Sequence, residues 1–415
     1  GKADIQHVER QLGITGEANL DKVERSVRYL RKQGLRVFFD AEHFFDGYKR
    51  DSNYALDVLT RAAEGGAERL VLCDTNGGLM SHEALSIVEH TTQVLEERLD
   101  GSDIKGMLGV HLHNDCDNAI GNAQALLHLI TQVQGTINGL GERVGNLNLT
   151  TFLGNYLDKL GGNLPNINLE LLTQTYRQSC FLSSIPENDT QPYAGRYAFA
   201  HAGGIHINGI SKGASYEHTD PTKFGNQRVF VLNQLAGSSG IIEIAKQHSI
   251  PLARDKNNFE GNAKRLFEEL QVLETNGYDV GAIPAEQYLL LRKHFGNAKP
   301  PFRIKLTRIN TETDLQEDEH SRFYALCEFP NGQLKEAKFS VEGGPIDAAF
   351  NALKDMLRET YPQVDTLHLA NYDAHISRFS EERSKMRTEV LFRNGKTFST
   401  VGVDQSILYS GVKAL

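Results

Sequence analysis

Helix-like and strand-like patterns of apolar residues alternate along the first 160 residues of the chain. The first helix is marked by apolar positions three or four apart: Leu20, Val23, Val27 and Leu30. Gly34 follows where helices commonly end, and residues 35–41 are then apolar at most positions, as in a strand buried on both faces. The pattern predicts one helix followed by one strand.

The same alternation continues to residue 160. The predicted strands are 35–41, 69–74, 107–113 and 132–138, and the predicted helices between and after them are 54–63, 82–99, 118–130 and 147–160. Apolar strands separated by amphipathic helices predict a parallel sheet that is covered by helices, either a (β/α)8 barrel or a doubly wound sheet. The fold class predicted from the sequence is therefore α/β.

Polar residues gather directly after each predicted strand. They are Asp40 and Glu42, Asp74 and Thr75, His111 and His113, and Asn138 and Glu142. In a TIM (β/α)8 barrel this end of the strands carries the catalytic groups. The placement favours the barrel, and we expect residues 1–165 to belong to a catalytic domain of this kind.

The pattern changes after residue 165. Residues 166–298 contain several helical patterns broken by glycine-rich turns, and we interpret them as a helical linker region. A boundary follows at Lys299, Pro300 and Pro301. Beyond it, strand-like segments surround one amphipathic helix, residues 345–361, so residues 299–415 are predicted to form a separate α+β domain.

Two hairpins are predicted within that α+β domain. Its strand-like segments are 302–309, 322–329, 334–341, 366–375, 387–392 and 397–403. Asn331-Gly332 and Asn394-Gly395 each separate two of them, and Asn-Gly is a residue pair that tight hairpin turns favour. The strands on either side of each turn should therefore pair antiparallel.

Composition and charge argue against several classes of protein. The 415 residues are 40% apolar, with 44 basic against 53 acidic side chains and a net charge of −9, and no Lys/Arg block suggests a nucleic-acid surface. No apolar run approaches the roughly 18 residues that cross a bilayer, and no secretory signal pattern opens the chain. The four cysteines are far apart, which argues against a disulfide framework. We expect a cytoplasmic protein that binds neither nucleic acid nor membrane.

The sharpest chemical signal is His111-Leu112-His113 at the end of a predicted strand. Residues two apart on a strand face the same way, so both imidazoles can reach one metal ion. For an arbitrary sequence of this kind, a pair of histidines satisfied by hydrogen bonds is the commoner explanation. The position among other polar strand ends favours metal binding, and Mg²⁺, Mn²⁺, Co²⁺ and Zn²⁺ all stay open.

A glycine-rich loop, residues 139–146, follows the last of these strands. Its glycines permit tight turns, and Asn146 can either cap the next helix or supply a carbonyl oxygen to the ion. The loop matches neither the P-loop nor the dinucleotide fingerprint, the two common glycine-rich phosphate motifs. From the loop alone, a capped turn between strand and helix is the simpler interpretation.

Two further strand ends carry candidate substrate-binding groups. Glu42 lies among aromatic residues that could remove it from water and raise its pKa toward the range of a general base, although a solvated loop acid fits the spacing equally well. Thr75 lies in Asp74-Thr75-Asn76-Gly77-Gly78, which could donate hydrogen bonds to a carboxylate or could be a plain turn. Spacing alone does not decide between these interpretations.

Six segments, in chain order, resemble the citramalate synthase branch of the 2-isopropylmalate and homocitrate synthase family, within the DRE-TIM metallolyase superfamily: FDAEHFFDGYK, LCDTNGG, HLHND, QGTINGLGER-x-GN, HAGGIH and SYEH-x-DP. HLHND together with GER-x-GN is specific for the superfamily. FDAEHFFDGYK is the segment that indicates the citramalate branch. The resemblance covers essentially the whole chain.

The resemblance implies a Claisen-type condensation by an acyltransferase. Acetyl-CoA would lose a methyl proton and add to an α-keto acid, pyruvate in this branch, to give (R)-citramalate for isoleucine biosynthesis. By motif, His111 and His113 would be metal ligands, with Asn146 as a further or water-mediated one. Thr75 would contact the carboxylate of the keto acid, and Glu42 would lie against its side chain or help in proton transfer.

Two residues outside the predicted barrel gain a role only through the resemblance. His206 and Tyr216 lie in the linker region, where most histidines are structural. In the family they would complete the acid/base site. The resemblance also allows them to act across a dimer.

The C-terminal segments GGPIDAAFNAL and STVGV resemble the regulatory, dimer-associated domain of the same family. A homodimer and isoleucine as feedback effector are therefore expected. Two alternatives stay open. The keto acid could be that of a 2-isopropylmalate or homocitrate synthase, or the chain could be a non-catalytic fragment that senses an amino acid or promotes oligomerisation.

Members of the family open with a strand that carries D-x-T-L-R-D-G, and no such motif exists in this chain. Asp4-Ile5-Gln6-His7-Val8 instead resembles the end of the fourth barrel strand, so residues 1–165 would be the second half of a TIM barrel. Four strand and helix units leave open sheet edges, because a parallel barrel closes only when its first and last strands pair.

We therefore predict that these 415 residues alone do not catalyse the condensation. The Asp and Arg of the absent motif, which bind the metal and the developing enolate in the family, would be lacking. The measurement is release of thiol from acetyl-CoA with pyruvate and Mn²⁺. Substantial turnover by the isolated chain would refute the prediction.

Overall fold

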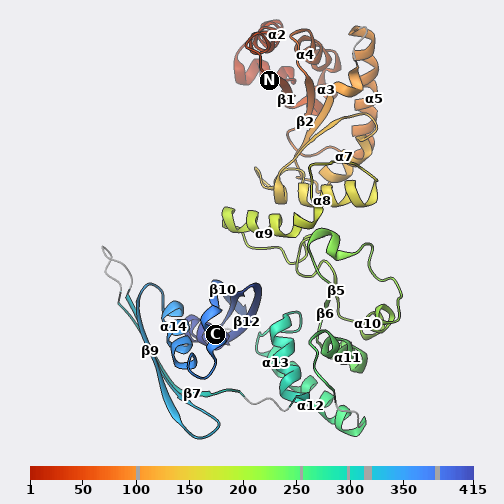
Figure 1. Ribbon diagram of the computed structural model, residues 1–415. Helices are drawn as coiled ribbons and strands as arrows, with labels where there is room; N and C mark the ends of the chain where they lie inside the picture. Colours follow the sequence, from red (N-terminus) through yellow and green to blue (C-terminus); the bar gives the residue numbers. More distant parts are fainter. Residues whose placement is uncertain (100–102, 253–255, 297–299, 313–319, 379–383) are drawn as a thin grey trace. The chain divides into compact units, whose positions relative to one another are not determined.

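The chain forms two compact units in the computed structural model (Figure 1). The structure describes residues 1–99, 103–252, 256–296, 300–312, 320–378 and 384–415. Unit 1 comprises Gly1–Phe199 and Thr219–Gln227, and unit 2 comprises Ala200–His218 and Arg228–Leu415. Lys299 of the predicted boundary lies outside the described residues. The division into residues 1–165, 166–298 and 299–415 stays a prediction.

Unit 1 is built on a parallel sheet in the strand order β1-β2-β3-β4. The strands are β1 (Phe38–Ala41), β2 (Arg69–Asp74), β3 (Leu108–Leu112) and β4 (Gln132–Gln134). In the register, Leu70 lies opposite both Phe39 and Leu108. Every residue of β2 after Arg69 is buried, as expected for a strand with both faces covered.

Residues before the first helix extend the same sheet. Lys2 pairs in parallel with Glu42, just beyond β1, and the Ala3 amide donates to the Glu42 carbonyl at 2.9 Å. The Glu42 amide in turn donates to the Gly1 carbonyl at 2.8 Å. Lys2 therefore lies at the same end of the sheet as the residues that follow β1.

Helices connect the strands of unit 1 and pack around the sheet. They are α1 (Ile5–His7), η1 (Val8–Leu12), α2 (Gly16–Lys32), α3 (Phe44–Arg50), α4 (Ser52–Glu64), α5 (Ser81–Arg98), α6 (Ile104–Met107), α7 (Ala119–Leu126), η2 (Ile137–Gly139), α8 (Leu149–Gly154) and η3 (Asn155–Lys159). Helix α2 begins where Thr15 accepts a hydrogen bond from Ala18 N. Its buried residues Leu20, Val23 and Val27 form the apolar face that the sequence predicts, on the helix that packs against α4.

The remaining regular elements described in unit 1 are helices, separated by turns and irregular segments. They are η4 (Leu169–Leu171), α9 (Leu172–Ser183) and η5 (Pro221–Phe224). Thr173 Oγ1 on α9 donates to the Phe224 carbonyl at 2.7 Å, and the Phe224 ring lies 4.6 Å from that of Tyr193. These contacts fix residues 219–227 within unit 1.

Unit 2 opens with a small strand pair and a group of helices. Its first elements are β5 (Ala200–His201), α10 (Gly204–Ser211), β6 (Val229–Phe230), η6 (Gln234–Ala236), α11 (Gly237–Gln247), α12 (Lys256–Thr275) and α13 (Pro284–Phe295). Strands β5 and β6 pair in parallel. The helices share one apolar core, which includes Ile207, Ile241, Ile244, Leu266, Leu270 and Leu291. A helical region was expected here, whereas the strand pair was not.

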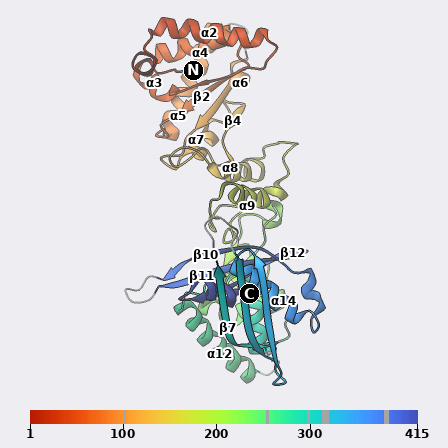
Figure 2. The ribbon, with the colours of Figure 1, turned by 90° about the vertical axis from the view of Figure 1, so that its left-hand side faces the viewer.

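The C-terminal part of unit 2 repeats one motif of three strands and a helix (Figure 2). The elements are β7 (Arg303–Glu312), β8 (His320–Glu328), β9 (Leu334–Glu342), α14 (Pro345–Leu357), η7 (Pro362–Thr366), β10 (His368–Arg378), β11 (Lys385–Asn394), β12 (Lys396–Asp404) and α15 (Ile407–Ala414). Each trio of strands forms an antiparallel sheet. Helix α14 packs on the first sheet and α15 on the second.

The α/β fold class and the antiparallel C-terminal domain are confirmed, and both predicted hairpins exist. Gly332 and Gly395 have φ of 80° and 70°, the left-handed backbone that explains glycine at these turns. The structure differs from the prediction in several elements: β4 ends at Gln134 rather than at residue 138, the predicted helix 147–160 is divided into α8 and η3, and α3 was not predicted. Helix α14 ends at Leu357, and α15 was not predicted because its eight residues show too short a pattern.

Across the described residues, no helix combines the length and the apolar character that a bilayer span requires.

Candidate active site

His111 and His113 lie at the carboxyl end of β3. His111 belongs to the strand, and His113 follows its last residue, Leu112. The centroids of the two rings are 5.3 Å apart, with 67° between the ring planes. The prediction that both imidazoles share one side of the strand end is therefore confirmed.

Hydrogen bonds fix the ring of His111. Its Nδ1 lies 3.0 Å from Gln134 Oε1, and Gln134 Nε2 donates to Asp40 Oδ1 at 3.1 Å. Because a carboxylate only accepts, Asp40 sets the orientation of the Gln134 amide, and the amide oxygen then requires a proton on His111 Nδ1. The lone pair on His111 Nε2 is thus the one left for a metal ion, as in metal sites whose histidines are held by an outer hydrogen bond.

Asn146 lies directly opposite His113, in an antiparallel bridge. Two buried atoms there, His113 Nδ1 and Asn146 Oδ1, have no hydrogen-bond partner among the described residues. Such atoms are rare in proteins because leaving them unpaired is costly, and a bound ion is one explanation for them. Burial lowers the pKa of His113, and the charges of Arg143 and His111 act in the same direction, so the ring stays neutral as a metal ligand must.

The tight turns of the glycine-rich loop, residues 139–146, determine where Asn146 lies. Gly145 has φ of 105°, and a Cβ there would lie 1.9 Å from the Gly139 carbonyl oxygen, so no other residue fits this position. Asn146 Nδ2 donates to the Leu140 carbonyl at 3.2 Å, which leaves Oδ1 as the free acceptor. The capping interpretation of Asn146 is wrong, because Asn148 Oδ1 accepts from Thr150 N at 2.9 Å and caps α8.

The donor atoms of this cluster fit a divalent cation. Imidazole nitrogen suits Zn²⁺ and Co²⁺, and an amide oxygen is a ligand that Mn²⁺ and Mg²⁺ also accept. Within the described ranges, no group of three His, Cys, Asp or Glu side chains could hold a metal. Within this cluster, the amide oxygen of Asn146 is the third potential ligand atom beside the two imidazoles.

Glu42 has a cationic partner that the sequence did not indicate. Lys2 Nζ lies 2.5 Å from Glu42 Oε1. Partial burial opposes ionisation, but the hydrogen bond and charge of Lys2 outweigh it and hold the pKa of Glu42 below its ordinary value. The expectation of a raised pKa is wrong, because the rings of Phe44 and Phe45 are buried in the core while the Glu42 side chain stays 43% exposed.

Thr75 belongs to the turn that follows β2. Its Oγ1 accepts a hydrogen bond from His43 N at 2.8 Å, so the hydroxyl proton remains to serve as a donor. Its carbonyl accepts from Arg143 Nη2 at 2.8 Å, and Arg143 also holds Asp115 through two bonds of 2.7 and 3.0 Å. The turn is thus a structural element whose threonine hydroxyl can still bind a ligand.

His206 and Tyr216 come together in unit 2. His206 lies on α10, and the Tyr216 ring stacks on it with centroids 4.6 Å apart and 30° between planes. Both side chains are exposed, Tyr216 by 43%. The structure therefore places the candidate site residues in two clusters, one in each unit.

Two residues of the unit 1 cluster, Lys2 and Gln134, were missed by the sequence analysis. Neither residue type is a common metal ligand. Gln134 could have been found from register, since it lies in the strand next to His111 and opposite it. Lys2 had no comparable signal, because its strand-like pairing with Glu42 is visible only in the structure.

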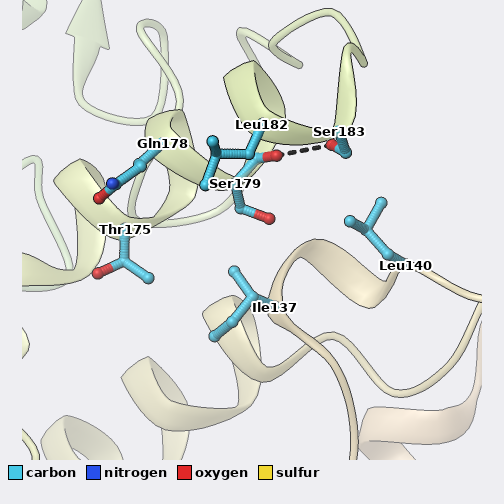
Figure 3. Close-up of a pocket in the computed structure, with 7 residues that line it drawn as sticks. All are labelled: Ile137, Leu140, Thr175, Gln178, Ser179, Leu182 and Ser183. Atoms are coloured by element: carbon cyan, nitrogen blue, oxygen red, sulfur yellow. Dashed lines mark hydrogen bonds between the residues drawn. The ribbon is translucent and has the colours of Figure 1, made fainter.

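A separate groove in unit 1 includes none of the predicted site residues (Figure 3). It has a volume of about 410 Å³ and lies between α9 and the turn after β4. Its lining residues are Ile137, Leu140, Thr175, Gln178, Ser179, Leu182 and Ser183. Its walls lack titratable groups, so the groove offers no acid/base chemistry.

Three family models match the chain in succession. Residues 2–178 match the HMGL-like family, residues 194–269 the homocitrate synthase post-HMGL domain-like family, and residues 283–415 the LeuA allosteric (dimerisation) domain. The order of the three models agrees with a barrel segment, a linker and a C-terminal regulatory domain.

The most similar relatives include several (R)-citramalate synthases. Those of Aquifex aeolicus and Synechocystis are both 36% identical over all of this chain, covering 77% and 76% of their own length. A 2-isopropylmalate synthase of Sulfurisphaera tokodaii is 30% identical over 68% of this chain and 69% of its own. Among solved structures, hydroxymethylglutaryl-CoA lyase of Pseudomonas aeruginosa covers 45% of this chain and 62% of its own at 18% identity and a TM-score of 0.38.

We predict that Glu42 titrates below the ordinary range of a glutamate and that Lys2→Met raises its pKa. The substitution removes the hydrogen bond and charge that lower the pKa, while the burial that raises it remains. The measurement is the ¹³C shift of the Glu42 carboxyl carbon during a pH titration.

Lys49→Met provides the matched control, because Lys49 Nζ lies 2.8 Å from Glu83 and lowers the pKa of that residue instead. It should raise the pKa of Glu83 and leave that of Glu42 in place. An unchanged Glu42 midpoint in Lys2→Met would show that Lys2 does not control this carboxyl.

Proposed function

Because the chain belongs to the (R)-citramalate synthase family, we propose that it binds pyruvate beside a divalent metal ion and serves its condensation with acetyl-CoA to (R)-citramalate. Thioester hydrolysis would complete the reaction and release the thiol. The relatives that match the whole chain support this choice of keto acid. The matches to 2-isopropylmalate synthases keep the branched keto acid as the second candidate.

The side-chain cluster at the carboxyl end of β3 is the observation that carries the proposal. His111, His113 and Asn146 meet at one strand end, with two buried acceptor atoms left unpaired. When bound there, a divalent metal supplies a Lewis acid that polarises the keto group of the substrate. The protein contributes the orientation of its ligands, above all the His111 tautomer that Gln134 and Asp40 fix.

Two side chains near this strand end would orient the keto acid. The Thr75 hydroxyl, which accepts a hydrogen bond from His43 N, would donate a hydrogen bond to the carboxylate of the keto acid. Glu42, kept ionised by Lys2, lies against the substrate methyl group as a fixed negative charge. Its low pKa makes it a weak proton acceptor, so orientation is its main role.

His206 and Tyr216 would carry the proton transfers. An imidazole changes charge near neutral pH and can accept the proton from the acetyl methyl group of acetyl-CoA. The Tyr216 hydroxyl, on a ring stacked against His206, can donate a hydrogen bond to an oxygen that gains negative charge. Both groups are exposed and open to a ligand in unit 2.

The C-terminal domain would regulate the enzyme. Its match to an allosteric and dimerisation domain supports a homodimer. We propose isoleucine as its effector, since an end product of the pathway that begins with citramalate is the natural feedback signal. A purely sensing, non-catalytic role is less well supported, because the relatives that match the whole chain are synthases.

We predict that His111→Ala and His113→Ala each weaken Mn²⁺ binding at least about tenfold, and that Gln134→Leu weakens it by about tenfold through loss of the fixed tautomer. The measurement is the signal of free Mn²⁺ in electron paramagnetic resonance during a titration. His128→Ala, which removes an exposed histidine of the same unit, is the control and should bind as the parent chain does. Equal affinity in His111→Ala would rule out the proposed ligand set.

Binding of keto acids tests the substrate. We expect the Mn²⁺-loaded chain to bind pyruvate at least about tenfold more tightly than 2-ketoisovalerate or 2-oxoglutarate, because a site specific for pyruvate would have to exclude the extra methylene groups of the one and the second carboxylate of the other. Water-proton relaxation of the bound Mn²⁺ reports each dissociation constant. A preference for either larger acid would overturn the choice of pyruvate, and calorimetric binding of isoleucine without any keto acid binding would favour the sensing role.

A further inference from the structure

The stacking of Tyr216 on His206 depends on how the chain returns along α10. Helix α10 ends at Ser211, and Gly213, with φ of 85°, turns the chain back so that Ala214 N donates to the Gly209 carbonyl at 2.9 Å. The Tyr216 ring then lies over both His206 and Gly209, which are three residues apart on the helix. A Cβ at Gly209 would approach Tyr216 Cε2 to 2.5 Å, so the ring occupies the space that glycine leaves.

The next residue, Glu217, is anchored by two partners. Arg228 binds its carboxylate through Nε and Nη2, each at 2.6 Å, and His201 Nε2 donates to Oε1 at 3.1 Å. The Glu217 side chain is 10% exposed and that of His201 is 9% exposed. Two-point binding of a carboxylate by a guanidinium fixes direction as well as distance. The hydrogen bonds of Arg228 and His201 lower the pKa of Glu217 despite its burial, so it is ionised at neutral pH.

This ionic triad joins three separate segments of unit 2. His201 lies just after the chain enters the unit at Ala200, Glu217 just before it leaves at His218, and Arg228 where it returns. His201 belongs to β5 and lies opposite Phe230 of β6, and Arg228 directly precedes β6 in the chain. The side chains of the triad therefore connect the β5 and β6 pair with the irregular segment that carries Tyr216.

We propose that Glu217 is a positioning residue for catalysis: clamped by Arg228 and His201, it holds the backbone of residues 214–218 so that the Tyr216 ring stays stacked on His206. The proposal rests on the role of His206 and Tyr216 in the proposed function, and it deepens that role. The side chains of adjacent residues point away from the backbone in different directions. When Arg228 and His201 hold Glu217, the ring of Tyr216 therefore stays directed toward α10. The triad itself touches no reacting atom.

A structural role of the triad alone would alter stability without altering the ring pair. The distinguishing quantity is the ring-current effect of Tyr216 on the ¹³Cε1–H signal of His206, measured in the full chain labelled at histidine. His206→Gln identifies the signal. Tyr216→Ala defines the unstacked position, and Tyr216→Phe should keep the parent position because it retains a ring.

We expect Glu217→Gln to move the His206 signal by at least half of the change that Tyr216→Ala causes, and Arg228→Gln to do the same. Glu217→Asp, which keeps the negative charge, should move the His206 signal less than Glu217→Gln does. Glu269→Gln is the matched control: Glu269 also binds a cation and a histidine in unit 2, Lys293 at 2.6 Å and His294 at 2.7 Å, but it lies on α12. Glu269→Gln should lower the melting temperature about as much as Glu217→Gln does, and it should leave the His206 signal unchanged.

An unmoved His206 signal in both Glu217→Gln and Arg228→Gln would overturn the proposal, as would an equal shift in Glu269→Gln. Gly209→Ala, whose Cβ would displace the ring directly, confirms that the signal reports stacking even if one triad variant fails to fold. The readout needs no turnover. Two results together would separate the two proposals: Glu217→Gln unstacks Tyr216, and the parent chain fails to bind Mn²⁺ and pyruvate. The positioning role of Glu217 would then stand, and the proposed function would be rejected.

Discussion

The unit 1 cluster depends on one hydrogen-bonded chain, from Asp40 through the Gln134 amide to His111. A histidine binds a metal only through an unprotonated nitrogen, so the position of the ring proton decides whether the strand end can hold an ion. The parallel sheet makes this chain possible, because it brings the carboxyl ends of β1, β3 and β4 to one edge. His113, whose Nδ1 is unpaired, lies beside the oriented His111 ring, and Asn146 lies opposite His113.

Local patterns in the sequence were sufficient for most of the fold. The apolar spacing of α2, the all-buried β2 and the Asn-Gly hairpins each depend on neighbours within a few residues, which a sequence displays directly. The helix α15 was too short to show a period. The placement of His111 and His113 at one strand end could also be predicted from the sequence, because they are two residues apart on a strand.

Long-range pairing is what the sequence did not reveal. The direction of the Glu42 pKa depends on Lys2, which lies 40 residues away and meets it only through sheet pairing. Aromatic neighbours in sequence indicated the opposite direction, but Phe44 turns inward to the core. The identity of the α8 cap shows the same limit at short range: Asn146 and Asn148 are equally good capping residues, and only the backbone of the preceding turn selects Asn148.

The most direct test of the account is pulsed electron paramagnetic resonance of Mn²⁺ bound to the chain, comparing natural abundance with ¹⁵N-histidine labelling. Two imidazole nitrogens should give modulations that change with the label, and only one should remain in His111→Ala. Modulations from solvent protons alone, unaffected by the label, would contradict this expectation, because the strand end would then not hold the ion.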